Sequence, residues 1–112
     1  MAKNKYGAVQ DFCPPCGRWH RSKAEATRAH ELFLMEKAKV IRQLQHEPMW
    51  VLSKTPKITY KADFQFVTQE GQQVVEDVKG ILTRETRVKL AWLKEKYGVD
   101  VNLIRTGRQH ER

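Results

Sequence analysis

The feature that most constrains the fold of this chain is a pair of strand-forming runs separated by a short polar segment. Residues 58–67 and 73–78 are rich in β-branched and aromatic side chains, and the segment 69–71 between them ends in glycine. This pattern predicts a β-hairpin with a three-residue loop whose glycine takes the left-handed conformation. With that loop length the register places Asp63 directly opposite Asp77, so two carboxylates share one face of a sheet.

Opposed carboxylates on a sheet are destabilising, because their β-carbons lie only about 5 Å apart. A divalent cation would remove the repulsion, and hard oxygen ligands suit Mg²⁺ or Mn²⁺. Lys79 follows Asp77 by two residues and shares its face, where an ammonium can orient a water or offset charge on a phosphate. Asp63, Asp77 and Lys79 therefore form the candidate site. The alternative is an ordinary solvated hairpin face, since an Asp-x-Lys triplet is common by chance.

These residues resemble the PD-(D/E)xK nuclease superfamily, with Asp63 as the first acid and Asp77-Val78-Lys79 as the (D/E)xK triplet. The proline of that pattern is absent, because Ala62 precedes the first acid. More narrowly, the order SKAEA, long helix, strand with a proline, ADF, EDVKG and basic helix resembles small phage-encoded endonucleases and Holliday-junction-resolvase-like proteins. The resemblance covers residues 22–104.

The resemblance implies a Mg²⁺-dependent endonuclease, acting on DNA by metal-assisted hydrolysis and preferring branched structures such as Holliday junctions. Asp63, Asp77 and the Val78 carbonyl would hold the Mg²⁺ (or Mn²⁺), Glu25 on the first helix would add a third acid, and Lys79 would position the attacking water. A resolvase makes two symmetric cuts, which implies a homodimer.

The first helix is predicted over 22–39. Ser22 and Glu25 have the spacing of a capping box, so Glu25 has two possible interpretations, as a helix cap or as a metal ligand. The apolar face of this helix is expected to contain Ala26, Ala29, Leu32, Phe33 and Val40.

The rest of the chain predicts one further helix and more strands. Residues 40–52 become extended around Pro48, which favours a first strand that is bulged or at an edge, and 53–57 is a turn. Thr83 or Thr86 begins a second helix that reaches Tyr97 and stops at Gly98. Residues 99–104 alternate as a last strand. We therefore expect a single α/β domain, with a mixed central sheet flanked by helices in the order αβββαβ.

Composition agrees with a small basic globular protein. The 112 residues, 40% hydrophobic and 30% charged, suffice for one domain, and no apolar run reaches the ~18 residues of a membrane span. No signal segment is visible, so we expect a cytoplasmic protein, in the host if phage-encoded. The net charge of +8 favours nucleic acid as partner. The phosphate-contacting residues expected on the second helix are Arg84, Arg87, Lys89 and Lys94, although such charges can also be merely solubilising.

Cys13 and Cys16, in FCPPCGRWH, have the spacing of a zinc knuckle, and His20 is a candidate third ligand. A fourth ligand is missing locally, so an inert reduced turn and a redox pair stay open. We assign 1–21 to an N-terminal arm with this turn, 22–104 to the nuclease domain and 105–112 to a disordered tail. Two rivals remain: a non-catalytic nucleic-acid-binding module with a zinc knuckle, and a degenerate nuclease fold that binds a host protein.

Overall fold

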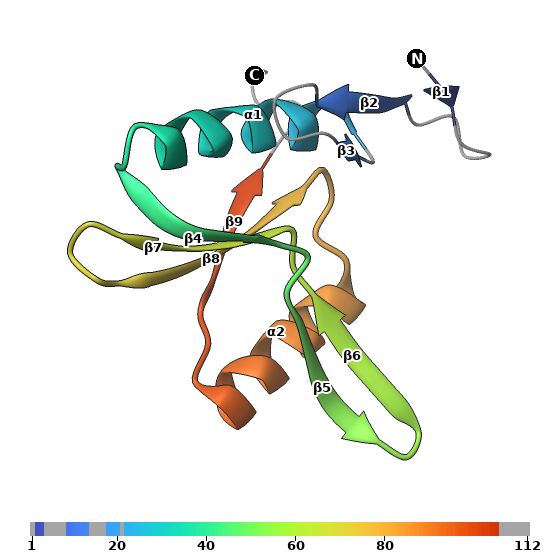
Figure 1. The fold of residues 1–112 in the computed structure, drawn as a ribbon. Helices are drawn as coiled ribbons and strands as arrows, with labels where there is room; N and C mark the ends of the chain where they lie inside the picture. Colours follow the sequence, from blue (N-terminus) through green and yellow to red (C-terminus); the bar gives the residue numbers. More distant parts are fainter. Residues whose placement is uncertain (1, 4–8, 14–17, 21, 106–112) are drawn as a thin grey trace, which may run out of the picture.

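The chain forms a mixed four-stranded sheet with one helix on each side (Figure 1). A computed structural model describes the backbone of residues 2–3, 9–13, 18–20 and 22–105, and the side chains of 22–105. The elements are β1 (Ala2–Lys3), β2 (Val9–Cys13), β3 (Arg18–His20), α1 (Lys23–Lys37), β4 (Ile41–His46), β5 (Met49–Lys54), β6 (Lys57–Lys61), β7 (Phe64–Thr68), β8 (Gln73–Lys79), α2 (Arg84–Tyr97) and β9 (Val101–Arg105). The predicted α/β class is confirmed.

The central sheet has the strand order β4-β7-β8-β9. The pairs β4–β7 and β7–β8 are antiparallel, whereas β9 runs parallel to β8. A parallel pair needs a crossover connection, and α2 supplies it. The predicted last strand is observed, and it extends to Arg105, which had been expected in the tail. Separately, β1, β2 and β3 form a small antiparallel sheet.

Three strands were expected between the helices, and five are observed, because two long strands bend in the middle. Residues 40–52 were expected to form one strand and form β4 and β5. Residues 58–67 likewise divide between β6 and β7. The distal halves, β5 and β6, leave the central sheet and pair with each other as a two-stranded ribbon. The hydrophobic pattern specified extended backbone at these positions but not the bend.

Hydrogen bonds continue through the bend. The Glu47 amide donates to the Asp63 carbonyl at 2.9 Å, and the Ala62 amide donates to the Pro48 carbonyl at 3.0 Å. Pro48 has no amide hydrogen of its own and lies outside both strands. As predicted, β4 is an edge strand and is bulged, with a register shift between Arg42 and Gln45.

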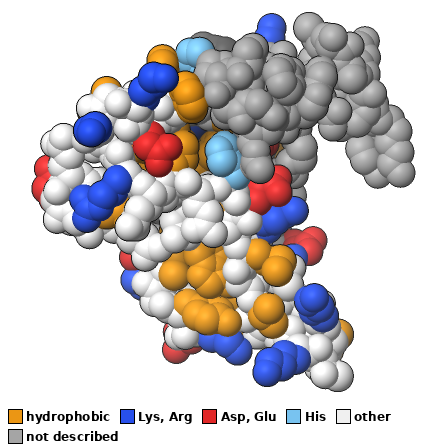
Figure 2. All heavy atoms as spheres, in the orientation of Figure 1, with side chains coloured by type: hydrophobic (Ala, Val, Ile, Leu, Met, Phe, Trp, Pro, Cys, Tyr) orange, Lys and Arg blue, Asp and Glu red, His pale blue; other side chains and the backbone are white. Residues whose placement is uncertain are grey.

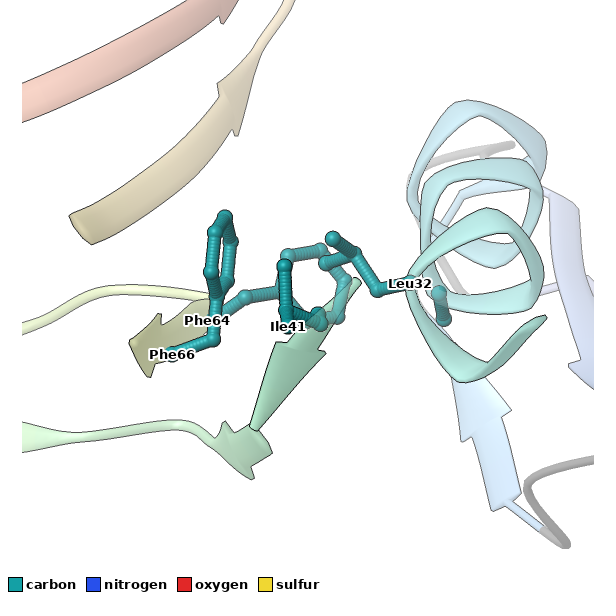
Figure 3. Close-up of a cluster of buried hydrophobic side chains, with 5 residues drawn as sticks. Leu32, Ile41, Phe64 and Phe66 are labelled. Atoms are coloured by element: carbon teal, nitrogen blue, oxygen red, sulfur yellow. The ribbon is translucent and has the colours of Figure 1, made fainter. Parts of the chain in front are cut away.

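Helix α1 begins as the sequence predicts, because the Ser22 hydroxyl accepts a hydrogen bond from the Glu25 amide at 3.1 Å. The part of its apolar face that is buried consists of Ala26, Ala29 and Leu32. Leu32 points at Ile41, Phe64 and Phe66 of the sheet, and together with Ala29 these side chains form one core (Figure 3). Phe33 is only half-buried, and Val40, which follows the helix, is 44% exposed, so the predicted face was too wide.

Helix α2 closes a second core on the other side of the sheet. Thr83 caps its start, accepting from the Thr86 amide at 3.1 Å, and Gly98 ends it in the left-handed conformation at φ 70°. Leu93 is fully buried against Leu52, Tyr60 and Val75. The other apolar residues of this helix reach the core only in part: Leu90 and Trp92 are half-buried, whereas Val88, Ala91 and Tyr97 are exposed.

An ion pair between the part-buried Arg28 and the buried Glu76 ties α1 to β8. The Arg28 guanidinium donates two hydrogen bonds to the Glu76 carboxylate, at 2.8 and 2.7 Å, while the Glu76 side chain is only 3% exposed. The bond to Glu76 raises the pKa of Arg28 above its already high value. Glu76 therefore faces α1, and its neighbour Asp77 faces the core of α2, as the alternation of a strand requires.

Candidate active site

The hairpin between β7 and β8 brings Asp63 and Asp77 together in the predicted register. Phe64 pairs with Glu76, and the Asp63 amide donates to the Glu76 carbonyl at 3.1 Å. The Thr68 amide donates to the Gln72 carbonyl at 2.9 Å, which closes the expected loop 69–71, with Gly71 at φ 89°. Both carboxylates are buried: Asp63 is 3% exposed and Asp77 is 0% exposed.

Asp63 lies at the bend that divides β6 from β7, which turns its side chain toward the end of β8. Its Oδ2 accepts a hydrogen bond from the Val78 amide at 2.7 Å. Burial, followed by its hydrogen bond with Asp77 and the charge of Glu25, raises the pKa of Asp63 to about 7, although the bond from Val78 opposes the shift. The carboxylate pair therefore retains a proton near neutral pH unless another positive charge replaces it.

Besides its hydrogen bond with Asp63, Asp77 is held from two further sides at a single oxygen. Its Oδ2 accepts a hydrogen bond from the Tyr60 hydroxyl and lies 3.2 Å from Lys79 Nζ. Its other oxygen, Oδ1, is buried without a hydrogen-bond partner among the residues that the structure describes. A buried carboxylate oxygen without a donor is unfavourable by roughly 1–3 kcal/mol or more, so this atom is suited to a cation.

Tyr60 is a site residue that the sequence prediction missed. It projects from β6 into the core of α2, and its hydroxyl is directed to Asp77. Burial and the neighbouring Asp77 carboxylate raise the pKa of Tyr60, which keeps its hydroxyl protonated as a donor. A buried tyrosine hydroxyl usually has a polar partner, but only the bend between β6 and β7 reveals which one.

Glu25 lies near the carboxylate pair without completing a cluster. It is 6% exposed in the first turn of α1, and its charge contributes to the raised pKa of Asp63. Its backbone amide is engaged by Ser22, which is one half of the predicted capping box. Within residues 22–105, no three His, Cys, Asp or Glu side chains form a group that could hold a metal ion.

The donor set nevertheless suits Mg²⁺. This ion keeps several waters and is commonly bound by one or two carboxylates plus substrate phosphates, so it needs no complete cage of protein ligands. Asp63 and Asp77 supply the carboxylates, and one of them has the unpartnered oxygen. The Val78 carbonyl leaves its strand on the same side as the amide, which points at Asp63, so it is directed to the same place.

The zinc prediction falls largely outside the described residues. Cys16 is outside them, and so are the side chains of Cys13 and His20, whose backbones end β2 and β3. Zinc at this turn therefore stays a prediction.

The basic residues expected to meet phosphate on α2 differ in their surroundings. Arg84 and Arg87 are exposed. Lys89 Nζ lies 3.4 Å from Glu85 Oε2 on the same helix, and Lys94 Nζ lies 2.8 Å from Asp100 Oδ2, as expected of solubilising charges. The two arginines are thus the stronger candidates for phosphate contact.

The raised pKa of Asp63 predicts a pH-dependent stability in EDTA. In the folded chain the pKa of Asp63 is about 7, whereas an unfolded aspartate has a pKa of 3.8, so between these pH values only the folded chain holds the proton. The resulting stabilisation is complete below about pH 4 and is lost as the pH rises through 7. We expect the free energy of unfolding to fall by up to about 4 kcal/mol across this window, measured by urea titration. Asp63→Asn should flatten the profile, and an equal slope in the variant would contradict the assignment.

The sequence of this chain matches a known protein family. The family described as "Protein of unknown function (DUF1064)" matches residues 4–110, nearly the whole chain, so the protein belongs to it. No curated protein and no solved structure matches the chain. Among the described residues, no helix has the length and apolar character needed to cross a membrane.

Proposed function

We propose that this member of the DUF1064 family is a divalent-cation-dependent endonuclease of the PD-(D/E)xK type that hydrolyses phosphodiester bonds in DNA. The observation that carries the proposal is the buried Asp63–Asp77 pair beside Lys79, with one carboxylate oxygen unpartnered. A structural pair would be expected to satisfy that oxygen, whereas a site for Mg²⁺ leaves it available. The net charge of +8 agrees with a polyanionic substrate.

The contacts of each site residue suggest its role in cation binding and hydrolysis. Asp63, Asp77 and the Val78 carbonyl would hold the cation, and Glu25 would bind it directly or through water. When bound, the cation polarises the scissile phosphate and lowers the pKa of a bound water. Tyr60 fixes the orientation of Asp77, so the second oxygen stays directed at the site. Lys79, already beside Asp77, orients the attacking water or offsets charge that gathers on the phosphate.

Branched DNA, and Holliday junctions in particular, is the substrate class that the resemblance suggests, and a homodimer would be needed for paired cuts. The direct test is cleavage of a labelled four-way junction, a flap and a linear duplex in parallel with Mg²⁺, Mn²⁺ or EDTA. We expect cutting only with a divalent cation, and on the junction at paired, symmetric positions. Binding to every substrate with no cutting under either cation would favour the non-catalytic nucleic-acid-binding module instead.

The arginines of α2 lead to a separate prediction about binding. Changing both Arg84 and Arg87 to alanine should make the plot of log affinity against log salt concentration shallower by roughly two, about one per lost phosphate contact. The effect should be similar for all DNA sequences, because phosphate contacts carry no base information. Fluorescence anisotropy at several salt concentrations measures the slope.

The matched control removes the same charge elsewhere, by changing Lys37 on α1 and Arg42 on β4 to alanine. This variant should keep the wild-type slope. A shallower slope in the control, or an unchanged slope in the α2 variant, would remove this helix from the DNA-binding surface.

A further inference from the structure

A groove of about 680 Å³ lies between β6 and the first half of α2. Its helical residues recur at the spacing of a single helix face. The apolar part of the lining comes from both elements, and the charged part is mostly basic. We call the apolar lining residues Ile58, Val88 and Trp92 the floor of the groove, and the basic lining residues Lys57, Arg84 and Lys89 its rim.

The floor of the groove exposes apolar surface that the second core does not cover. Val88 is 56% exposed, and Trp92 and Ile58 are each half-buried, with one side in the core of α2. Figure 2 shows hydrophobic side chains gathered on the lower part of the molecule, where Figure 1 places α2, β5 and β6, with Lys and Arg side chains around them. Contiguous apolar surface with a polar rim is typical of a binding site.

The rim identifies the kind of ligand. Lys57, Arg84 and Lys89 are positive, and the one acid in the lining, Glu85, is engaged by Lys89 at 3.4 Å. The groove therefore combines an excess of positive charge with an aromatic side chain. A nucleotide has the complementary pair of properties, a flat base and a negative phosphate, and aromatic platforms within basic grooves bind unpaired bases.

The groove also lies next to the carboxylate pair. Ile58 and Tyr60 occupy the same face of β6 and both contribute to the second core, and Tyr60 contacts Asp77. Two residues along a strand span about 7 Å, which is about two base-pair steps of B-DNA. A DNA strand with a phosphate at Asp77 would thus have a nucleotide about two steps away within reach of the groove.

We propose that this groove binds one unpaired nucleotide close to the scissile phosphate, with its base against Trp92 and its phosphate at Arg84 and Lys57. The inference rests on the proposed nuclease function and deepens it, since it restricts the preferred substrate to DNA with an unpaired or easily unstacked base. The volume of the groove falls within the usual range for small-ligand sites, about 300–1,000 Å³. A fully paired duplex keeps its bases stacked and cannot fill the groove.

Binding in EDTA tests this inference without requiring cleavage, so failure here and failure of the nuclease proposal can be told apart. The probes are a short duplex with a single-stranded flap and the same duplex fully paired. Wild-type protein should bind the flap duplex about tenfold more tightly, and Trp92→Leu should lower affinity for the flap duplex alone, by about five- to tenfold or more. Trp92→Phe, which keeps an aromatic ring, should retain most of the preference. A 2-aminopurine base in the flap should lose fluorescence on binding wild type but not Trp92→Leu.

A surface variant keeps the test decisive if Trp92→Leu fails to fold. Val88→Glu introduces a negative charge into the groove at an exposed position, and should abolish the preference for the flap duplex. The matched control is Leu34→Glu on α1, where the wild-type side chain is similarly exposed, at 50%. Equal loss on flap and paired duplex, or equal loss in both glutamate variants, would overturn the proposal. A change in sedimentation with Val88→Glu, without a change in DNA binding, would mean instead that a second copy of the chain occupies the groove.

Discussion

Replacing Asp77 by asparagine should lower the rate of DNA cleavage by about 10³-fold or more, with DNA binding retained or tighter. The substitution keeps the shape of a fully buried side chain and an oxygen that can accept from Tyr60. It removes the negative charge that a divalent cation requires. It also removes repulsion toward the phosphates, which is why binding should not weaken. Single-turnover cleavage and anisotropy in EDTA measure the two effects.

The matched control is Asp100→Asn, which makes the same chemical change at a side chain that is 80% exposed and paired with Lys94. Its cleavage rate should equal that of wild type. Thermal unfolding must accompany both variants, because a collapsed Asp77→Asn protein would also be inactive. If Asp77→Asn folds and still cuts DNA at the wild-type rate, the carboxylate pair is not the catalytic site.

Replacing Arg28 by methionine should destabilise the fold by roughly 3–5 kcal/mol, the loss expected when a buried ion pair loses one partner. Methionine keeps much of the apolar bulk of the arginine stem, so the loss reports the charge that is left behind. Glu76 would remain 3% exposed with both guanidinium bonds gone. Urea unfolding monitored by circular dichroism measures the free-energy difference.

Two further variants separate the buried pair from its surface neighbour. Glu31 also contacts Arg28, at 2.9 Å, but is 54% exposed, so Glu31→Ala should change stability by less than about 1 kcal/mol. The double variant Arg28→Met/Glu76→Leu removes both charges and should recover most of the loss, since a buried apolar pair is often as stable as an ion pair. A double variant as unstable as Arg28→Met alone would show that packing, and not the stranded charge, dominates.

The parts of the structure that the sequence predicts well depend on short stretches of neighbouring residues. The loop 69–71 and the alternation of the strands were enough to place Asp63 opposite Asp77. Capping residues located the start of both helices, and Gly98 located the end of α2. These features depend on a few neighbouring residues, whose backbone preferences act before any tertiary contact.

The features that were missed all depend on distant parts of the chain. Each of two extended segments was predicted as a single strand, because nothing in a hydrophobic pattern distinguishes a strand that continues from one that bends and changes sheets. Without the bend, Tyr60 could not be assigned to Asp77. The Arg28–Glu76 pair joins residues 48 positions apart, and the groove exists only where β6 meets α2. Spatial partners of this kind have no local signature.

The bend at Ala62 and Asp63 also determines where this chain can change in length. Residues 57–68 supply Tyr60 to one core and Phe64 and Phe66 to the other, so an added or deleted residue inside this stretch would turn one set of side chains to the wrong face. Insertions at 69–71 or at the Thr55–Pro56 turn would leave both cores in place. In relatives of this chain, the distance from Tyr60 to Phe66 should therefore be fixed, while these two turns vary freely in length.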